Sequence, residues 1–437
     1  MKLRIAQIDL FERDVPFTHP FRFGAVTVEA APQAYIRVEV AVEGHGTAVG
    51  GSAELMVPKW FDKDPCKTPA QTIDGLRHSL QLAAAAYQGA EGAAFAIHAE
   101  RHAAHTAACA AIGLPPLVAA FGMTELDKAV LDALFRAVGV GAWAGLAANL
   151  AMLDATLTHD LEPGEIDGFL RRQRPAASVP VRHAVGYLDD VSALPDTLAA
   201  TGCQWLKLKL SGDPEADRAR LRAIAAVLPH TVRGASLDAN EQYDPTLLPV
   251  LHAILQDPAI RPITDRLLYV EQPVARGTLD LGLFASQHPC VMDEGDDSYG
   301  AFPAALEHGW RGVSIKSCKG VYKALLNAVR AQKAGAMLTA EDLTTQPGLA
   351  LQQDAALVAF LGLPHMERNG HAYTAGFVDP SEAERFGMAH PELYEGARLR
   401  LHDGAITTAR IGAAIGYGSA AHPDWHALTP MQPGLTG

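Results

Sequence analysis

The stretch WLKLKL, residues 205–210, decides how this chain is expected to fold. Leucines and lysines alternate in it, and because strand side chains alternate between two faces, Lys207 and Lys209 point to the same side. An isolated Lys-x-Lys is typical of a solvated edge strand, since an ammonium group prefers water. Later strand-like runs end in carboxylates or in another lysine, and they favour a buried strand whose lysines face a polar site.

Similar short apolar runs lie on both sides of this stretch, and helical stretches separate them. One run precedes it at 179–185, and the others follow at 234–240, 267–273, 290–294, 312–316, 336–341 and, less clearly, 364–368. Strand and helix that alternate about eight times are typical of a (β/α)₈ barrel. The sequence therefore predicts an α/β fold built on such a barrel.

The regions outside the barrel have other patterns. Residues 1–60 alternate like an antiparallel sheet, residues 69–160 are alanine-rich and helical, and the tail from 395 returns to short strands and turns. We expect an N-terminal α+β region over 1–160, the barrel over 161–394, and a segment over 395–437 that packs back on the first region. Within the N-terminal region, the apolar and aromatic residues 54–61 are expected to form a core loop rather than a substrate lid.

Two other patterns in the helical region partly resemble binding sites. His98, His102 and His105 share one helix face, which suits zinc, but a polar stripe on an exposed helix is the commoner meaning of such spacing. The glycines at 139, 141 and 145 lack both the dinucleotide-binding spacing and a preceding strand. Thr124 is expected to cap a helix over 125–138.

Bulk composition excludes several classes of protein. The formal charge is −13, which argues against nucleic acid as a partner, because phosphate binding requires a basic surface. No apolar run is long enough for a membrane span, and the first residues lack the apolar core of a signal peptide. The five scattered cysteines form no Cys-x-x-Cys and fit reduced thiols. We expect a cytoplasmic protein that binds a small molecule.

Polar residues at the carboxyl ends of the predicted strands would meet at one mouth of the barrel. The candidates are Lys207, Lys209, Asp238, Glu271, Asp293 and Lys316. Three converging carboxylates repel one another unless a cation neutralises them, and oxygen ligands suit Mg²⁺ rather than zinc. Asn240 points the same way as Asp238. A neighbouring Lys207 and exclusion of water would lower the pKa of Lys209, which would make it a general base.

These segments, taken in order, resemble the enolase superfamily and within it the muconate-lactonizing-enzyme (muconate cycloisomerase) subgroup. The segments are Lys-x-Lys at 207–209, Asp-Ala-Asn at 238–240, Glu-Gln-Pro at 271–273, Asp-Glu at 293–294 and Ile-Lys at 315–316. The resemblance implies a modified (β/α)₈ barrel with an N-terminal capping domain that the C-terminal segment completes. We also expect a homo-oligomer.

The resemblance also implies roles for the residues. Asp238, Glu271 and Asp293 resemble the ligands of Mg²⁺, with Mn²⁺ as a substitute ion. Lys209 and Lys316 resemble an acid/base pair, and Lys207 resembles a helper that tunes Lys209 and touches a substrate carboxylate. Asn240 and Glu341 are expected to bind substrate. Because Gly295 stands where serine commonly follows Asp-Glu, Glu294 remains an alternative third ligand.

The implied reaction is abstraction of a proton α to a carboxylate, which gives an enediolate. Racemisation, epimerisation or cycloisomerisation would follow, and elimination by a dehydratase or lyase is the alternative. The seventh run, Thr339 to Asp342, lacks the histidine of the mandelate-racemase subgroup. A Schiff-base aldolase would leave the carboxylates without a role, and a non-catalytic metal-binding barrel would leave the lysines without one. Substrate choice is expected to lie near 21–26, 56–61 and 365–369.

Overall fold

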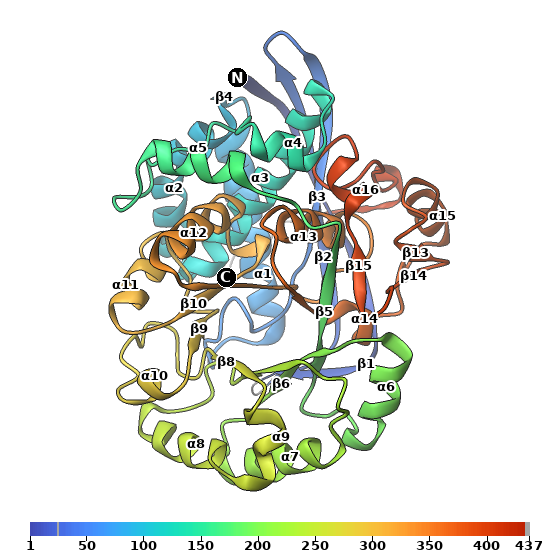
Figure 1. The fold of residues 1–437 in the computed structure, drawn as a ribbon. Coiled ribbons are helices and arrows are strands. Elements are labelled where there is room, and N and C mark those ends of the chain that lie inside the picture. The colour runs from blue at the N-terminus through green and yellow to red at the C-terminus, as the bar shows by residue number, and fades with distance from the viewer. Residues whose placement is uncertain (24–25, 433–437) are drawn as a thin grey trace.

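The computed structural model describes residues 1–23 and 26–432. An antiparallel sheet with helices against it forms one part, and a barrel of parallel strands ringed by helices forms the other (Figure 1). Gly24 and Ala25, which fall within the predicted substrate-facing segment 21–26, lie outside the described residues.

Long, alternating strands build the N-terminal sheet. They are β1 (Leu3–Phe23), β2 (Val26–Val42) and β3 (Gly46–Leu55), with the short β4 (Glu91–Gly92) beside β1. The helices that follow are α1 (Pro69–Tyr87), α2 (Ala94–Ala111), α3 (Pro116–Val138) and α4 (Ala142–Ala147). Helix α3 lies so close to β3 that a Cβ atom on Gly50 would be 2.2 Å from the Ala129 carbonyl oxygen. We call this part the cap.

Parallel strands β5 to β12 form the barrel, as predicted from the alternating runs. They are β5 (Ser178–Val185), β6 (Trp205–Lys209), β7 (Gly234–Asp238), β8 (Leu267–Glu271), β9 (Cys290–Met292), β10 (Gly312–Ile315), β11 (Met337–Glu341) and β12 (Met366–Arg368). Pairing of β12 with β5 closes the ring. The ill-defined run at 364–368 is thus the eighth strand.

Helices of uneven length surround the barrel. They are α5 (Pro163–Arg172), α6 (Leu194–Thr201), α7 (Pro214–Val227), α8 (Leu248–Leu255), α9 (Arg261–Thr264), α10 (Phe284–Gln287), α11 (Ala301–Glu307), α12 (Val321–Ala334), α13 (Leu349–Phe360) and α14 (Gly370–Tyr373). Helix α7 begins at Asp213, whose side chain accepts from the amides of Glu215 and Ala216. Beyond α14 lie α15 (Pro380–Ala389), the β13 (Tyr394–Glu395) and β14 (Arg398–Leu399) pair, and α16 (Ala409–Ala413).

Strand register brings the site residues together. Lys209 is paired with Asp238 across β6 and β7, and Asp238 is paired with Glu271 across β7 and β8. On the other side of the ring, Glu341 of β11 is paired with Glu367 of β12. Four of these residues end their strands and Glu367 lies one residue before the end of β12, so the register alone places them at one mouth.

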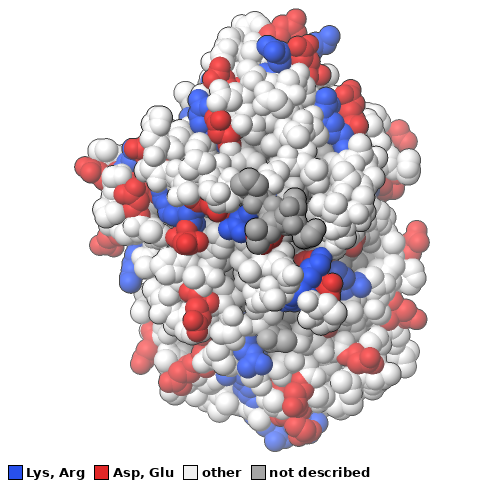
Figure 2. All heavy atoms as spheres, turned by 180° about the vertical axis from the view of Figure 1, so that it is seen from behind, with Lys and Arg blue, Asp and Glu red and all other residues white. Residues whose placement is uncertain are grey.

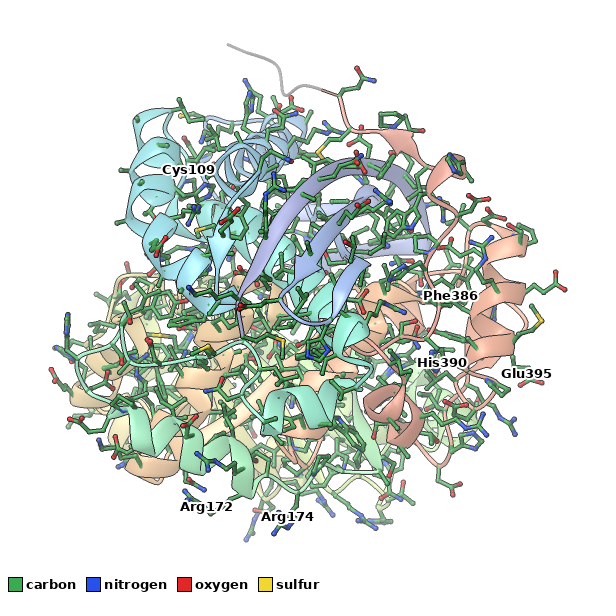
Figure 3. The ribbon with its side chains drawn as sticks, turned by 90° about the horizontal axis from the view of Figure 1, so that it is seen from above. Cys109, Arg172, Arg174, Phe386, His390 and Glu395 are labelled. Atoms are coloured by element: carbon green, nitrogen blue, oxygen red, sulfur yellow. The ribbon has the colours of Figure 1, made fainter. Side chains whose placement is uncertain are left out.

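The C-terminal segment contacts both parts of the molecule. Strand β15 (Ala405–Thr407) adds antiparallel to β5 at Ser178–Pro180, and β16 (Thr429–Pro430) adds antiparallel to β1 at Phe11–Glu12. In Figure 3, Cys109 in the cap helices lies on one side of the N-terminal sheet, and Phe386 and His390 of the C-terminal part lie on the other. The boundaries at 160/161 and 394/395 stay predictions.

Two sequence expectations about the cap helices are wrong. The histidine stripe is not exposed: His98 and His105 are 4% exposed, and His98 binds Asp127 (2.8 Å) and the Tyr299 hydroxyl (2.8 Å). Thr124 does not cap a helix, because α3 already begins at Pro116. Its hydroxyl instead donates to the Ser317 carbonyl (2.8 Å) and so joins the cap to the barrel. Tertiary packing overrides the local patterns in both cases.

The distribution of charged side chains on the surface and the state of the cysteines are ordinary for a globular protein. Basic and acidic side chains are interspersed over the face in Figure 2. All five cysteines are free, and only Cys66 among them is exposed. Within the described residues, no helix has both the length and the apolar character to cross a membrane.

Candidate active site

A ring of buried charges fills the barrel mouth. Its members come from seven strands, β6 to β12, or from the turns directly after them: Lys207, Lys209, Asp238, Glu271, Asp293, Lys316, Glu341 and Glu367, all less than 8% exposed. Buried charges are tolerated only when they are paired. Each of these groups has an oppositely charged partner within 3.1 Å.

Lys207 lies at the centre of the ring. Its Nζ is 2.7 Å from Glu341, 2.8 Å from Glu367, 2.9 Å from Asp238 and 3.0 Å from Glu271. Burial by itself lowers the pKa of Lys207, but the four carboxylates outweigh it and raise the pKa well above its usual value. Lys207 is therefore a permanent cation that holds the carboxylates together.

Lys209 does not have the lowered pKa that the sequence predicts. Its Nζ is 2.5 Å from Asp238 Oδ2, and although burial and Lys207 both act to lower the pKa of Lys209, Asp238 raises it overall. The same two lysines lower the pKa of Asp238 against the effect of burial. The sequence shows the like-charged neighbour of Lys209, but it does not show that the Asp238 carboxylate lies one strand away.

Lys316 faces the ring from the opposite side of the barrel. Strands β6 and β10 are four places apart in the closed ring of eight, so Lys209 and Lys316 approach the centre from opposite walls. The Nζ of Lys316 is 2.6 Å from Asp293 and 2.8 Å from Glu341, and it lies 4.4 Å from the centre of the Trp60 ring. Burial lowers its pKa, but Asp293 and Glu341 outweigh burial and raise it.

Aromatic rings of the cap cover both lysines. Trp60 lies over Lys316, and Phe21 lies over Lys209 with 6.0 Å between Nζ and the ring centre. Both rings are at least 96% buried. The segment 54–61 is thus a buried loop, as predicted, and it also reaches the site. Cation–π contacts of this kind contribute about 0.5–2 kcal/mol.

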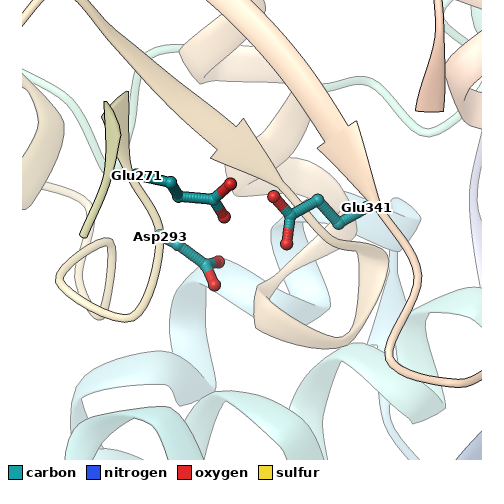
Figure 4. A group of neighbouring side chains, drawn as sticks. All are labelled: Glu271, Asp293 and Glu341. Atoms are coloured by element: carbon teal, nitrogen blue, oxygen red, sulfur yellow. The ribbon is translucent and has the colours of Figure 1, made fainter. Parts of the chain in front are cut away.

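Three carboxylates meet closely enough to share one cation. Oxygens of Glu271, Asp293 and Glu341 lie within 4.8 Å of one another and point toward a common centre (Figure 4). Burial and the adjacent Glu341 raise the pKa of Glu271 well above its usual value, and Glu271 Oε2 is buried without a hydrogen-bond partner. An unsatisfied oxygen beside two other carboxylates is what a hard, oxygen-binding cation requires. The residues present therefore fit a divalent metal ion.

Only two of the three predicted metal ligands belong to this cluster. Glu271 and Asp293 are in the cluster, and Asp238 is next to it, held by Lys207 and Lys209. Glu341, predicted to bind substrate, is the third member of the cluster. Asn240 donates its backbone N–H to Asp238 Oδ1 (2.8 Å), so it orients that carboxylate.

Glu294, the alternative third ligand, faces the cap. Its Oε1 accepts from Asn240 Nδ2 (3.1 Å) and from Lys63 Nζ (3.1 Å), so one of its oxygens is already used outside the cluster. The preceding residue, Asp293, is paired instead with Lys316 and Lys319 of the barrel.

Several residues of the site are not among those that the sequence predicts. Glu367 of β12 contacts Lys207, and burial raises its pKa to about 7. Arg182 of β5 is fully buried and lies 3.5 Å from Glu341. The alternation Met366-Glu367-Arg368 is the signal that marks Glu367, once that run is taken as a strand. Arg182 is marked in a similar way, because it is a basic residue within the mostly apolar run 179–185.

Among the described residues, no histidine belongs to this ring of charges. His365 precedes β12 and contacts the Arg182 guanidinium (2.8 Å) and the Trp205 ring, at the end of the barrel away from the mouth. Burial and Arg182 lower its pKa to about 3. Asp342 is held by Arg368 and by the Asn369 amide, so it forms no His–Asp pair.

Comparisons of the fold give clear neighbours. The chain is similar to an enolase-superfamily structure from Roseovarius nubinhibens ISM complexed with magnesium, with 22% identity, a TM-score of 0.67, and coverage of 98% of this chain and 99% of that one. It is similar to a mandelate racemase/muconate lactonizing protein from Herpetosiphon aurantiacus, with 20% identity, a TM-score of 0.65, and coverage of 96% and 99%.

A third neighbour carries a small molecule. It is an enolase from Bradyrhizobium complexed with magnesium and mandelic acid, with 17% identity, a TM-score of 0.64 and coverage of 96% of each chain. No protein-family model matches the sequence, and the search of curated proteins gives no match. The structural neighbours share the whole capped barrel with this chain, so its fold is the enolase-superfamily fold.

Proposed function

We propose that this chain, which has the enolase-superfamily fold, is a metal-dependent enzyme of that superfamily that removes a proton from the carbon next to a carboxylate. One observation carries the proposal: two buried lysines, Lys209 and Lys316, face each other across a cluster of carboxylates. Neighbours with this fold are complexed with magnesium, one of them with mandelic acid as well. Such an arrangement suits acid/base work on both faces of one carbon.

In this proposal Glu271 and Asp293 hold Mg²⁺ together with Asp238, and Mn²⁺ can substitute. Glu341 is the alternative third ligand, because it completes the cluster in the structure. The ion would supply positive charge beside the substrate carboxylate, where negative charge develops. Since Asp238 and Asp293 now hold the two lysines protonated, ligation would also weaken those ion pairs and free an amine.

The lysines then have separate roles. One of Lys209 and Lys316 takes the α-proton and the other returns a proton to the opposite face or supports a leaving group. Lys207 stays charged and orients the substrate carboxylate, and Asn240 orients Asp238. We propose racemisation, epimerisation or cycloisomerisation as the outcome, with elimination from a hydroxy acid as the alternative. A homo-oligomer in the cytoplasm remains a prediction from sequence.

Deuterium exchange tests the proposal directly. In ²H₂O with Mg²⁺, wild type should exchange the α-proton of a carboxylate substrate, and mandelate is the first probe to try. Lys209→Ala should abolish exchange from one enantiomer and Lys316→Ala from the other, by about 10²–10⁴-fold each. Unimpaired exchange in both variants would sink the proposal, and metal binding without exchange by any carboxylate would indicate a non-catalytic barrel.

Three substitutions, with Glu271→Gln as the reference, decide the third ligand. Asp238→Asn should weaken Mg²⁺ binding about as much as Glu271→Gln does. Glu341→Gln should keep most of the affinity for Mg²⁺ if Glu341 only pairs with the lysines. Isothermal titration with Mg²⁺ measures all three. The reverse ranking would assign Glu341 to the metal.

A further inference from the structure

The cap loop over residues 56–64 reaches the barrel mouth and places Trp60 on Lys316. Trp60 is 3% exposed, and the centre of its ring lies 4.4 Å from Lys316 Nζ. The loop follows β3 directly and forms no strand or helix of its own. Something outside the loop must therefore hold the ring in place.

Arg276, in the loop after β8, supplies that contact. Its guanidinium donates to the backbone carbonyls of Trp60 and Phe61, each at 3.0 Å. The same guanidinium donates to both carboxylate oxygens of Glu241, at 2.9 and 2.8 Å. Arg276 thus joins the cap-loop backbone to a carboxylate that the loop after β7 holds at the barrel rim.

Lys63 adds a second contact to the same carboxylate. Its Nζ is 2.5 Å from Glu241 Oε2 and 2.7 Å from the Asn240 carbonyl. Two cations from opposite sides of the junction therefore meet on Glu241, whose side chain is 5% exposed. Charge-assisted and bidentate contacts of this kind fix geometry as well as add energy.

Unfavourable backbone conformations gather at this junction. Lys59 (φ 63°), Asn240 (φ 43°), Glu241 (φ 70°) and Gln272 (φ 32°) all have left-handed backbone, although none is glycine. Such conformations persist only where surrounding contacts fix them, and they commonly occur where geometry serves function. Among the described contacts, the Glu241 carboxylate is the one that both Arg276 and Lys63 share here.

We propose that Arg276 is a positioning residue: by holding the carbonyls of Trp60 and Phe61 against Glu241, it keeps the Trp60 ring over Lys316. This inference rests on the proposed role of Lys316 in proton transfer. With the ring in place, the Lys316 ammonium lies between the Trp60 ring and its ion pairs with Asp293 and Glu341 in the carboxylate cluster. Without it, the side chain gains freedom and water gains access, and only the face that Lys316 serves is affected.

Hydrogen exchange of the backbone tests the positioning without any substrate. Arg276→Met keeps an unbranched apolar side chain, shorter than arginine, and removes every side-chain donor, and Glu241 keeps Lys63 and the backbone N–H of residue 276 as partners. In the full-length protein, exchange of the peptide over 56–64 should rise about tenfold, because local opening becomes easier. Arg222→Met is the matched control, since its ion pair with Asp257 joins α7 to the turn before α9, away from the cap. Unchanged exchange of the 56–64 peptide would overturn the positioning role.

The consequence for Lys316 is tested by the two faces of the substrate. For a carboxylate that wild type exchanges, Arg276→Met should slow α-proton exchange on the Lys316 face about tenfold and leave the Lys209 face within about threefold. Trp60→Leu should do the same, the double variant should be no slower than either, and Trp60→Phe should recover much of the rate. Equal losses on both faces would refute the link to Lys316. If wild type exchanges the α-proton of no carboxylate, the proposed function is wrong. Hydrogen exchange of the 56–64 peptide would still decide whether Arg276 positions the loop.

Discussion

Lys207 is the residue whose loss should cost the site most. Four carboxylates lie within 3.0 Å of its Nζ, and it is fully buried. Lys207→Met should lower the free energy of unfolding by about 3–5 kcal/mol, because the buried carboxylates lose their common partner. Urea unfolding in EDTA measures the loss.

Lys333→Met is the control for Lys207. Its bridge to Glu165 is half-exposed at the lysine, and exposed pairs contribute about 0–1 kcal/mol. A loss for Lys207→Met as small as that of the control would contradict the central role of Lys207.

Glu367 gives the site a pH dependence of stability. Burial raises its pKa from 4.5 to about 7, so between these values the folded chain binds a proton that the unfolded chain has lost. Stability should therefore fall as pH rises from about 4.5 to about 7, and Glu367→Gln should flatten that fall. Urea unfolding of both proteins at several pH values checks this. Parallel curves would mean that Glu367 is already ionised throughout.

His365 should be dispensable for proton transfer. It contacts Arg182 and Trp205 at the far end of the barrel from the lysines. His365→Asn should keep α-proton exchange within about tenfold of wild type, short of the roughly 10²–10⁴-fold loss that removal of a general base causes. A loss in that larger range, with the fold intact by circular dichroism, would contradict the lysine assignment.

At the scale of elements, the close contact of β3 with α3 has a direct test. A Cβ atom on Gly50 would meet the Ala129 carbonyl oxygen at 2.2 Å and the Ala133 nitrogen at 2.3 Å, and both are backbone atoms that cannot turn aside. Gly50→Ala should cost about 1–3 kcal/mol or more, as overpacking does. Gly164→Ala, which would meet nothing within 4 Å in α5, should be neutral or stabilising. Thermal unfolding compares the two, and equal midpoints would contradict the close packing.

The barrel strands could be predicted because each is a short apolar run with a polar end. That signal is local, so it survives without any knowledge of the fold. The start of α3 could not be predicted, because Pro116 and Gly122 read as helix breakers. Pro116 is tolerated in the first turn, and a Cβ on Gly122 would lie 2.4 Å from the Ser79 carbonyl oxygen of α1. A neighbouring helix selects that glycine, and sequence spacing cannot show it.

The same division between local pattern and distant contact applies to the site. Residues at strand ends, such as Lys209, Asp238 and Lys316, follow from the barrel pattern alone. The pKa of Lys209 does not, because Asp238 is 29 residues away in sequence and 2.5 Å away in space. Trp60 and Arg276 belong to loops of different parts of the molecule, and only their folding together reveals the contact.

For the whole molecule, metal should act as a ligand of the folded state. The carboxylate cluster exists only when β8, the turn after β9, and β11 are assembled, so the unfolded chain offers no comparable site. Mg²⁺ at about 100 times its dissociation constant should add about 2.7 kcal/mol to stability, and EDTA should remove it. Glu271→Gln should lose the response, and thermal unfolding with and without Mg²⁺ measures it. An unchanged midpoint in wild type would contradict a metal site here.

The pairing of the C-terminal segment has a consequence for biosynthesis. On a translating ribosome, β1 emerges early but its partner β16 is among the last described strands to be made, and β5 must wait for both β12 and β15. The nascent chain therefore carries unpaired strand edges through most of its synthesis, and such edges invite pairing with other chains. We expect ribosome-bound chains arrested before residue 366 to need a chaperone to stay free of aggregation, and released chains to close both sheets quickly.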